Sequence, residues 1–231
     1  METQLIQIPR SPAPVELDLI ADLACPWSYL GKRSLERALT SLYSAPTVLR
    51  WHGLPLAGAS TLSWHEHLST RLPRRTRIET TQDALQQAGH EFGIRFDFAR
   101  LAKLPDTHDA HRLIALAARS GRQSELIDAL FSAFFEQGQD IAEHAVLARV
   151  AEQCQLADET QRAFADPAAA RDDILAEERR MRGLGIADVP SVLINGRVLV
   201  PGPADVATYV RALEQALFPE LPEEPNRRQL H

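Results

Sequence analysis

One cysteine lies where the sequence predicts a change from strand to helix. Cys25 follows an apolar, β-favouring run over residues 15–24, and Pro26 begins a segment with helical spacing. The unpaired backbone N–H groups and the positive dipole end of a helix N-terminus favour a thiolate over a thiol. We therefore expect Cys25 to be a nucleophile with a lowered pKa and to lie open to solvent.

Ser28 stands where a Cys-x-x-Cys centre would carry its second sulfur, so Cys25 cannot form a local disulfide. Any redox cycle needs a second thiol from elsewhere. Ser28 could instead hydrogen-bond the thiolate of Cys25 or that of a bound thiol. The chain's other cysteine, Cys154, follows a run with helical periodicity. We expect it to be a core residue of a helix, and the alternative is a distant resolving cysteine.

A second candidate feature is the dipeptide Val189-Pro190, which comes directly before a predicted hairpin. Asn195-Gly196 between two apolar runs is the signal for that hairpin. A proline at this place removes an N–H and leaves the backbone of Val189 free to pair with an extended peptide. The alternative is a proline that only starts a strand.

The elements that must position these residues follow from the hydrophobic periodicity. Strands alternate with helices at both ends of the chain, and helical periodicity prevails between residues 62 and 164. Outside this helical stretch, the periodicity predicts a strand at 15–24, a helix at 26–42, a strand at 47–52, a helix at 167–184, a hairpin at 191–200 and a helix at 204–217.

Composition narrows the functional classes. The chain has 231 residues, 45% of them hydrophobic, which is enough for a substantial core without disulfides. A net charge of -6 and the lack of a long basic block argue against a nucleic-acid partner. We see no leader segment and no span long enough for a membrane, so we expect no membrane partner and a cytoplasmic location, which the two cysteines also fit.

The histidines do not show the spacing of a metal site, so we predict no metal. We expect His111 to form hydrogen bonds in the core.

The turn at 25–32, Cys-Pro-Trp-Ser-Tyr-Leu-Gly-Lys, resembles the active-site turn of the DsbA-like thioredoxin-fold oxidoreductases, in particular their FrnE-like branch. Those proteins usually have Cys-Pro-Trp-Cys there. Their glutathione-dependent relatives, the 2-hydroxychromene-2-carboxylate isomerases and kappa-class glutathione transferases, look like Ser-Pro-Tyr-Ser. This chain has the first cysteine of one branch and the second serine of the other. Segments 88–96, 105–113, 129–141 and 185–191 also resemble the FrnE-like proteins.

The resemblance implies an α/β thioredoxin fold with an inserted all-helical domain. The thioredoxin-like domain would comprise residues 15–60 and 166–218, the inserted helical domain 61–165, and the tails 1–14 and 219–231. It also implies a cis peptide bond at Pro190, facing Cys25.

The candidate site residues fall into two groups. The catalytic candidates are Cys25, Ser28 and Pro190. The candidates for binding substrate or glutathione are Pro26, Trp27, Val189, Ala204 and Asp205. The last two are carried over from the kappa class, in which the start of the final helix holds the γ-glutamyl end of glutathione. The alternative is that Asp205 serves as a favourable charge at the helix start.

The resemblance implies a thiol–disulfide oxidoreductase that acts through a single nucleophilic cysteine on disulfide or glutathionylated substrates. Its partner would be a thiol or disulfide, either a small molecule or a protein. Glutathione would be the co-substrate, with no tightly bound cofactor. One alternative is a glutathione-dependent isomerase or transferase, and another is a non-catalytic peptide-binding or chaperone-like protein. The sequence leaves open the physiological substrate and whether the chain forms a homodimer.

Overall fold

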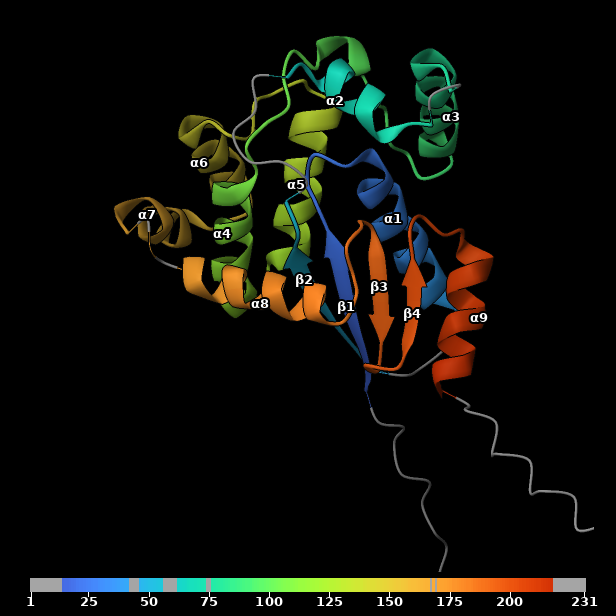
Figure 1. Ribbon diagram of the computed structural model, residues 1–231. Coiled ribbons are helices and arrows are strands. Elements are labelled where there is room, and N and C mark those ends of the chain that lie inside the picture. Colours follow the sequence, from blue (N-terminus) through green and yellow to red (C-terminus); the bar gives the residue numbers. More distant parts are fainter. Residues whose placement is uncertain are drawn as a thin grey trace, which may run out of the picture.

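The computed structural model describes residues 14–41, 46–55, 62–73, 76–166, 168 and 170–217. Within these residues the strands form a sheet in the order β2-β1-β3-β4 (Figure 1). Strands β1 and β2 are parallel, and the other two pairs are antiparallel. The strand bounds are Val15–Ala21 for β1, Thr47–Gly53 for β2, Ser191–Ile194 for β3 and Val198–Pro201 for β4.

Helices cover both faces of the sheet because side chains alternate along β1. Leu17 and Leu19 pack with α1 (Pro26–Ser41) and α9 (Val206–Leu217) on one face. Ile20 instead packs with Met181 of α8 (Arg171–Gly183) on the other face (Figure 1). Cys25 belongs to this second cluster. The β1-α1-β2 unit therefore delivers the cysteine to the sheet face that α8 covers.

The hairpin of β3 and β4 is confirmed. Asn195 and Gly196 have positive φ angles of 51° and 64°, the backbone that a tight two-residue hairpin turn requires. The backbone N–H of Glu16 donates to Asn195 Oδ1 at 2.9 Å, which fixes the turn against β1. The hairpin thereby holds the segment before Ser191 beside the end of β1.

A helical insert lies between β2 and β3, as expected (Figure 1). Aromatic side chains form the centre of its core, and Tyr29 of α1 stacks on Phe131 with ring centroids 4.7 Å apart. The Tyr29 hydroxyl donates to Glu136 at 2.9 Å, so this tyrosine anchors the insert to α1. The helices are α2 (Trp64–Arg71), α3 (Ile78–His90), α4 (His108–Ala117), α5 (Gln123–Phe135), α6 (His144–Gln153) and α7 (Ala157–Ala165), with short 3-10 helices at Phe98–Arg100 and Ala118–Ser120.

A cluster of ion pairs forms a second contact between α1 and the insert. Lys32 is fully buried, and its Nζ lies 2.7 Å from Asp128 of α5 and 2.5 Å from Glu36 of α1. Arg33 also pairs with both carboxylates.

Three predicted boundaries differ from the structure by two residues or more. Strand β1 ends at Ala21 rather than at residue 24, because the N–H of Cys25 donates to the carbonyl of Asp22 in a turn. Helix α9 begins at Val206, after Asp205, and α8 begins at Arg171, after Ala170 with its φ of 59°. The predicted domain limits at 60 and 61 and both tails except Pro14 lie outside the described residues.

Candidate functional site

The turn between β1 and α1 places Cys25 at the helix start. Its backbone carbonyl accepts hydrogen bonds from the N–H groups of Ser28 at 3.0 Å and Tyr29 at 3.4 Å. The side chain consequently leaves the helix at its N-terminal end, as the sequence predicts.

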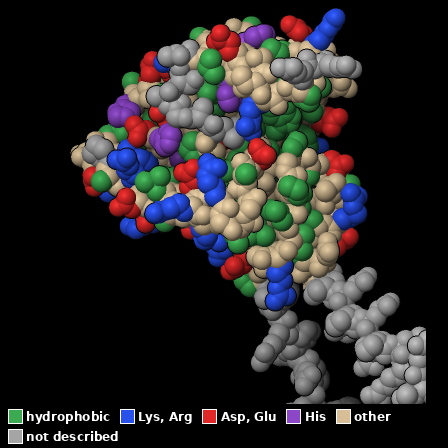
Figure 2. Space-filling model, in the orientation of Figure 1, with side chains coloured by type: hydrophobic (Ala, Val, Ile, Leu, Met, Phe, Trp, Pro, Cys, Tyr) green, Lys and Arg blue, Asp and Glu red, His purple; other side chains and the backbone are tan. Residues whose placement is uncertain are grey.

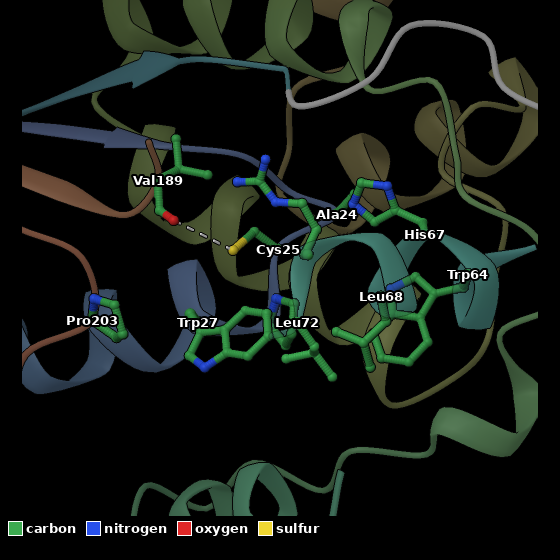
Figure 3. Close-up of a pocket in the computed structure, with 11 residues that line it drawn as sticks. Ala24, Cys25, Trp27, Trp64, His67, Leu68, Leu72, Val189 and Pro203 are labelled. Carbon is green, nitrogen blue, oxygen red and sulfur yellow. Dashed lines mark hydrogen bonds between the residues drawn. The ribbon is translucent and has the colours of Figure 1, made fainter. Parts of the chain in front are cut away.

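Val189 and Pro190 lie opposite the sulfur. The peptide bond between them is cis, as the family resemblance implied. The thiol of Cys25 donates to the carbonyl oxygen of Val189, with 3.9 Å between Sγ and O (Figure 3). Two segments that are 164 residues apart in the sequence therefore meet at the thiol.

Cys25 lines a cavity of about 200 Å³ between the sheet part and the insert. In Figure 3, Trp27 and Pro203 lie on one side of the sulfur, and Trp64, His67 and Leu68 of α2 lie on the other. Figure 2 shows hydrophobic side chains gathered between these two parts of the molecule. The full lining comprises Ala24, Cys25, Pro26, Trp27, Trp64, His67, Leu68, Arg71, Leu72, Val189 and Pro203.

The predictions that Cys25 has a lowered pKa and lies open to solvent are wrong. The residue is only 3% exposed, and burial raises the pKa of the Cys25 thiol to about 11. Hydrogen bonds from Ser28 and from the amide of Trp27 favour the thiolate, whereas the charge of Asp22 disfavours it. The helix start supplies the expected donors, but the loss of water outweighs them.

A buried polar network lies behind the thiol turn. Asp22, which is 1% exposed, accepts hydrogen bonds from Thr107 at 2.9 Å and from the N–H of Ala24 at 3.3 Å. His111 Nε2 is 3.3 Å from the same carboxylate oxygen, and Trp51 donates to His111 Nδ1 at 3.2 Å. Since Nδ1 accepts a hydrogen bond, Nε2 carries the proton that points to Asp22. His111 thus forms the core hydrogen bonds that the sequence predicts.

Ser28 links this network to the cysteine. It is fully buried, its Oγ accepts the N–H of Asp22 at 3.3 Å, and its hydroxyl acts to lower the pKa of the Cys25 thiol. The place of Ser28 beside the sulfur agrees with the sequence prediction.

The remaining predicted site residues divide into two groups. Pro26, Trp27 and Val189 line the cavity. Ala204 and Asp205 do not line it, and Asp205 Oδ1 accepts the N–H of Thr208 at 2.8 Å at the start of α9. This hydrogen bond supports the helix-start interpretation, and the glutathione contact of these two residues stays a prediction.

Sequence reasoning missed the contribution of α2 to the cavity. The Ser63-x-x-Glu66 capping box marks the start of that helix, but nothing local shows that one face of the helix lines the cavity beside Cys25. Asp22 was also missed, although a carboxylate at the end of an apolar strand is a recognisable signal.

Cys154 is a buried residue at the end of α6, in the core of the insert, as expected. Both cysteines are free thiols. Among the described residues, no group of three or more His, Cys, Asp or Glu side chains is arranged to hold a metal ion. None of the described helices has the length and apolar character that a membrane span requires.

The family model of the DSBA-like thioredoxin domain matches residues 16–214. A probable DsbA oxidoreductase from Streptomyces coelicolor has a similar structure, with a TM-score of 0.77, 26% identity and coverage of 91% of this chain and 93% of that one. No curated protein matches the chain.

Two further solved structures share the fold at lower identity. A 2-hydroxychromene-2-carboxylate isomerase has a TM-score of 0.66 at 13% identity, covering 88% of this chain and 97% of that one. The cytosolic disulfide reductase DsbM from Pseudomonas aeruginosa, solved with GSH, has a TM-score of 0.58 at 19% identity, covering 89% and 97%.

Proposed function

The chain belongs to the family of DSBA-like thioredoxin domains, and we propose that it is a thiol–disulfide oxidoreductase that works through Cys25 alone. The observation that carries the proposal is the position of the sulfur, 3.9 Å from the Val189 carbonyl and beside Pro190, in the wall of a cavity. A disulfide in that cavity would meet the sulfur and the backbone of residue 189 together.

The reaction has two exchange steps. The thiolate of Cys25 attacks one sulfur of a disulfide or glutathionylated substrate, a mixed disulfide forms, and the other sulfur leaves as a thiolate that takes up a proton. An external thiol, for which we propose glutathione, then attacks the mixed disulfide and releases Cys25. The external thiol is required because Ser28 occupies the place of a local resolving cysteine.

The raised pKa of Cys25 affects the rates of both exchange steps. With a pKa of about 11, roughly one Cys25 in ten thousand is ionised at neutral pH. A basic thiolate is a strong nucleophile once formed, but a poor leaving group. The small ionised fraction therefore slows the attack by Cys25, and its poor leaving ability slows its later release from the mixed disulfide.

The mass of the intact protein after incubation with oxidised glutathione tests the proposal. We expect one glutathione adduct, lost in Cys25→Ser and retained in Cys154→Ser. Excess reduced glutathione should then release the adduct, and the protein should turn over a glutathionylated peptide. A protein that forms no adduct at Cys25 would contradict the proposed function.

The second candidate function is glutathione-dependent isomerisation of an aromatic substrate. The observation that favours it is the aromatic and aliphatic wall of the cavity, formed by Trp27, Trp64 and Leu68. Against it, an attacking Cys25 would form a mixed disulfide with oxidised glutathione, with reduced glutathione as the leaving group, and so block the site. Isomerisation of 2-hydroxychromene-2-carboxylate without adduct formation would favour this candidate over disulfide exchange. Binding of peptides without any turnover would instead indicate the non-catalytic alternative.

A further inference from the structure

The cavity beside Cys25 carries one formal charge. Among the described residues that line it, Arg71 is the only one charged at neutral pH, since burial and the nearby charge of Arg71 lower the pKa of His67. The remaining lining is mainly apolar. A guanidinium in such surroundings attracts an anion more strongly than it would in open water. The positive group in the cavity lining is thus Arg71, in a chain with a net charge of -6.

The guanidinium is held by a weak, replaceable partner. Arg71 Nη2 lies 3.1 Å from Asp188 Oδ1, and the side chains are 38% and 77% exposed. Exposed ion pairs of this kind contribute only about 0–1 kcal/mol, so a ligand carboxylate can replace Asp188 at little cost. A guanidinium also offers a planar pair of donors that suits a carboxylate.

The position of the ion pair relates it to the reacting sulfur. Asp188 directly precedes Val189, whose carbonyl accepts from the Cys25 thiol. The hydroxyl of Ser191 donates to the carbonyl of Asp188 at 2.9 Å and fixes this loop. Arg71 therefore reaches from α2 across to the loop that faces the sulfur. A carboxylate bound there would belong to the molecule that Cys25 attacks.

Resting on the proposed function, we propose that Arg71 is a specificity-determining residue that selects disulfides bearing a carboxylate close to the sulfur. The substrate carboxylate displaces Asp188 from the guanidinium while the disulfide reaches Cys25. Cys25 then forms a mixed disulfide with one half of the substrate, and the other half leaves as a thiolate. The apolar wall of Trp27, Leu68 and Leu72 packs against the rest of the molecule.

Two aromatic disulfides that differ in charge test this proposal. The anionic one is 5,5′-dithiobis(2-nitrobenzoate), and the neutral one is 2,2′-dithiodipyridine; each releases a coloured thiol when Cys25 attacks. The ratio of the two rates cancels effects on the ionisation of Cys25. We expect Arg71→Gln to slow the anionic reagent about tenfold, the size of one charged hydrogen bond, and to leave the neutral reagent unchanged.

Three further variants test the role of Arg71, and a fourth supplies the blank. Asp188→Asn frees the guanidinium and should raise the rate with the anionic reagent only. Arg71→Lys keeps the charge but loses the paired donors, and should give an intermediate rate. Arg182→Gln removes an exposed arginine that pairs with Glu178 on α8, and should change neither rate. Cys25→Ser supplies the blank for Cys154, and thermal unfolding checks that each variant is folded.

The outcomes separate the two proposals. If neither reagent modifies Cys25 of the unaltered protein, the proposed function fails, and the specificity proposal fails with it. If both reagents react but Arg71→Gln changes both rates equally, or neither of them, disulfide exchange stands and the role of Arg71 is overturned.

Discussion

At the scale of single residues, Cys25 shows two opposed effects on one thiol. The helix start and Ser28 offer hydrogen bonds to the thiolate, whereas the closed surroundings deprive it of water. Interaction with a helix terminus contributes about 0.3–1 kcal/mol, and full burial can disfavour a charge by about 4–7 kcal/mol. Burial therefore prevails, and the thiol is protonated at neutral pH.

The pH dependence of alkylation tests this balance. Iodoacetamide reacts with the thiolate, so a raised pKa means that the rate at Cys25 keeps increasing with pH towards about 11. Peptide mapping separates Cys25 from Cys154. A rate that levels off near pH 8 or 9 would show that the thiol is an ordinary one.

Ser28→Ala tests the hydrogen bond to the sulfur. Without the hydroxyl the thiolate loses a charge-assisted hydrogen bond, so we expect the pKa of Cys25 to rise further and alkylation at pH 9 to slow about tenfold. Ser34→Ala changes another buried serine of α1 and serves as the control. Equal rates for the two variants would exclude a role for the Ser28 hydroxyl.

At the scale of elements, β2 and α4 meet so closely that only a glycine fits at the end of the strand. A Cβ on Gly53 would lie 2.5 Å from His111 Nδ1, the atom that accepts from Trp51. The close approach keeps the His111 ring beside Asp22 and orders the network behind the thiol turn. The packing of two elements thus determines the hydrogen bonds of a carboxylate near the site.

Gly53→Ala is therefore expected to displace the imidazole and to break its hydrogen bond with Trp51. We expect a loss of about 1–3 kcal/mol in the free energy of unfolding, measured with urea. Gly183→Ala is the control, because a Cβ there meets nothing within 4 Å and a helical alanine is favoured over glycine. An unchanged stability of Gly53→Ala would mean that the ring moves aside freely.

At the scale of the whole molecule, α1 belongs to two cores at once. One face of the helix packs on the sheet with α9, and its Tyr29 packs in the aromatic core of the insert. The buried ammonium of Lys32 adds an ion pair to the partly exposed Asp128 of α5. Since Cys25 lies at the start of this helix and the cavity lies between the two parts, α1 sets how the cavity walls face each other.

Asp128→Asn should weaken the interaction between α1 and α5 and lower the free energy of unfolding. Lys32 keeps Glu36 as a partner, so we expect a loss of about 1–3 kcal/mol rather than the larger penalty of an unpaired buried charge. Glu125→Gln on the same helix removes an exposed partner of Arg122 and should cost less than about 1 kcal/mol. Equal effects of the two variants in urea unfolding would contradict a special role of the buried pair.

The sequence predicts the features that depend on local signals. The β1-α1-β2 unit, the hairpin at Asn195-Gly196 and the helical insert follow from periodicity and turn residues. The approach of Cys25 to the cis Val189-Pro190 peptide follows from the family resemblance. The pKa of Cys25 does not follow, because it depends on side chains from distant segments, such as Met181 and Leu193, that pack around the thiol. The place of Arg71 in the cavity lining cannot be predicted from the sequence for the same reason, because contacts between distant segments bring it there.

The near-complete enclosure of Cys25 also acts as a size filter. Because Cys25 as a whole residue is only 3% exposed, the surface of a folded protein cannot reach its sulfur, whereas a slender molecule or an unfolded, extended segment can enter the cavity. We therefore expect the protein to ignore disulfides in compact, native partners and to react with those in small metabolites or in chains that have lost their structure.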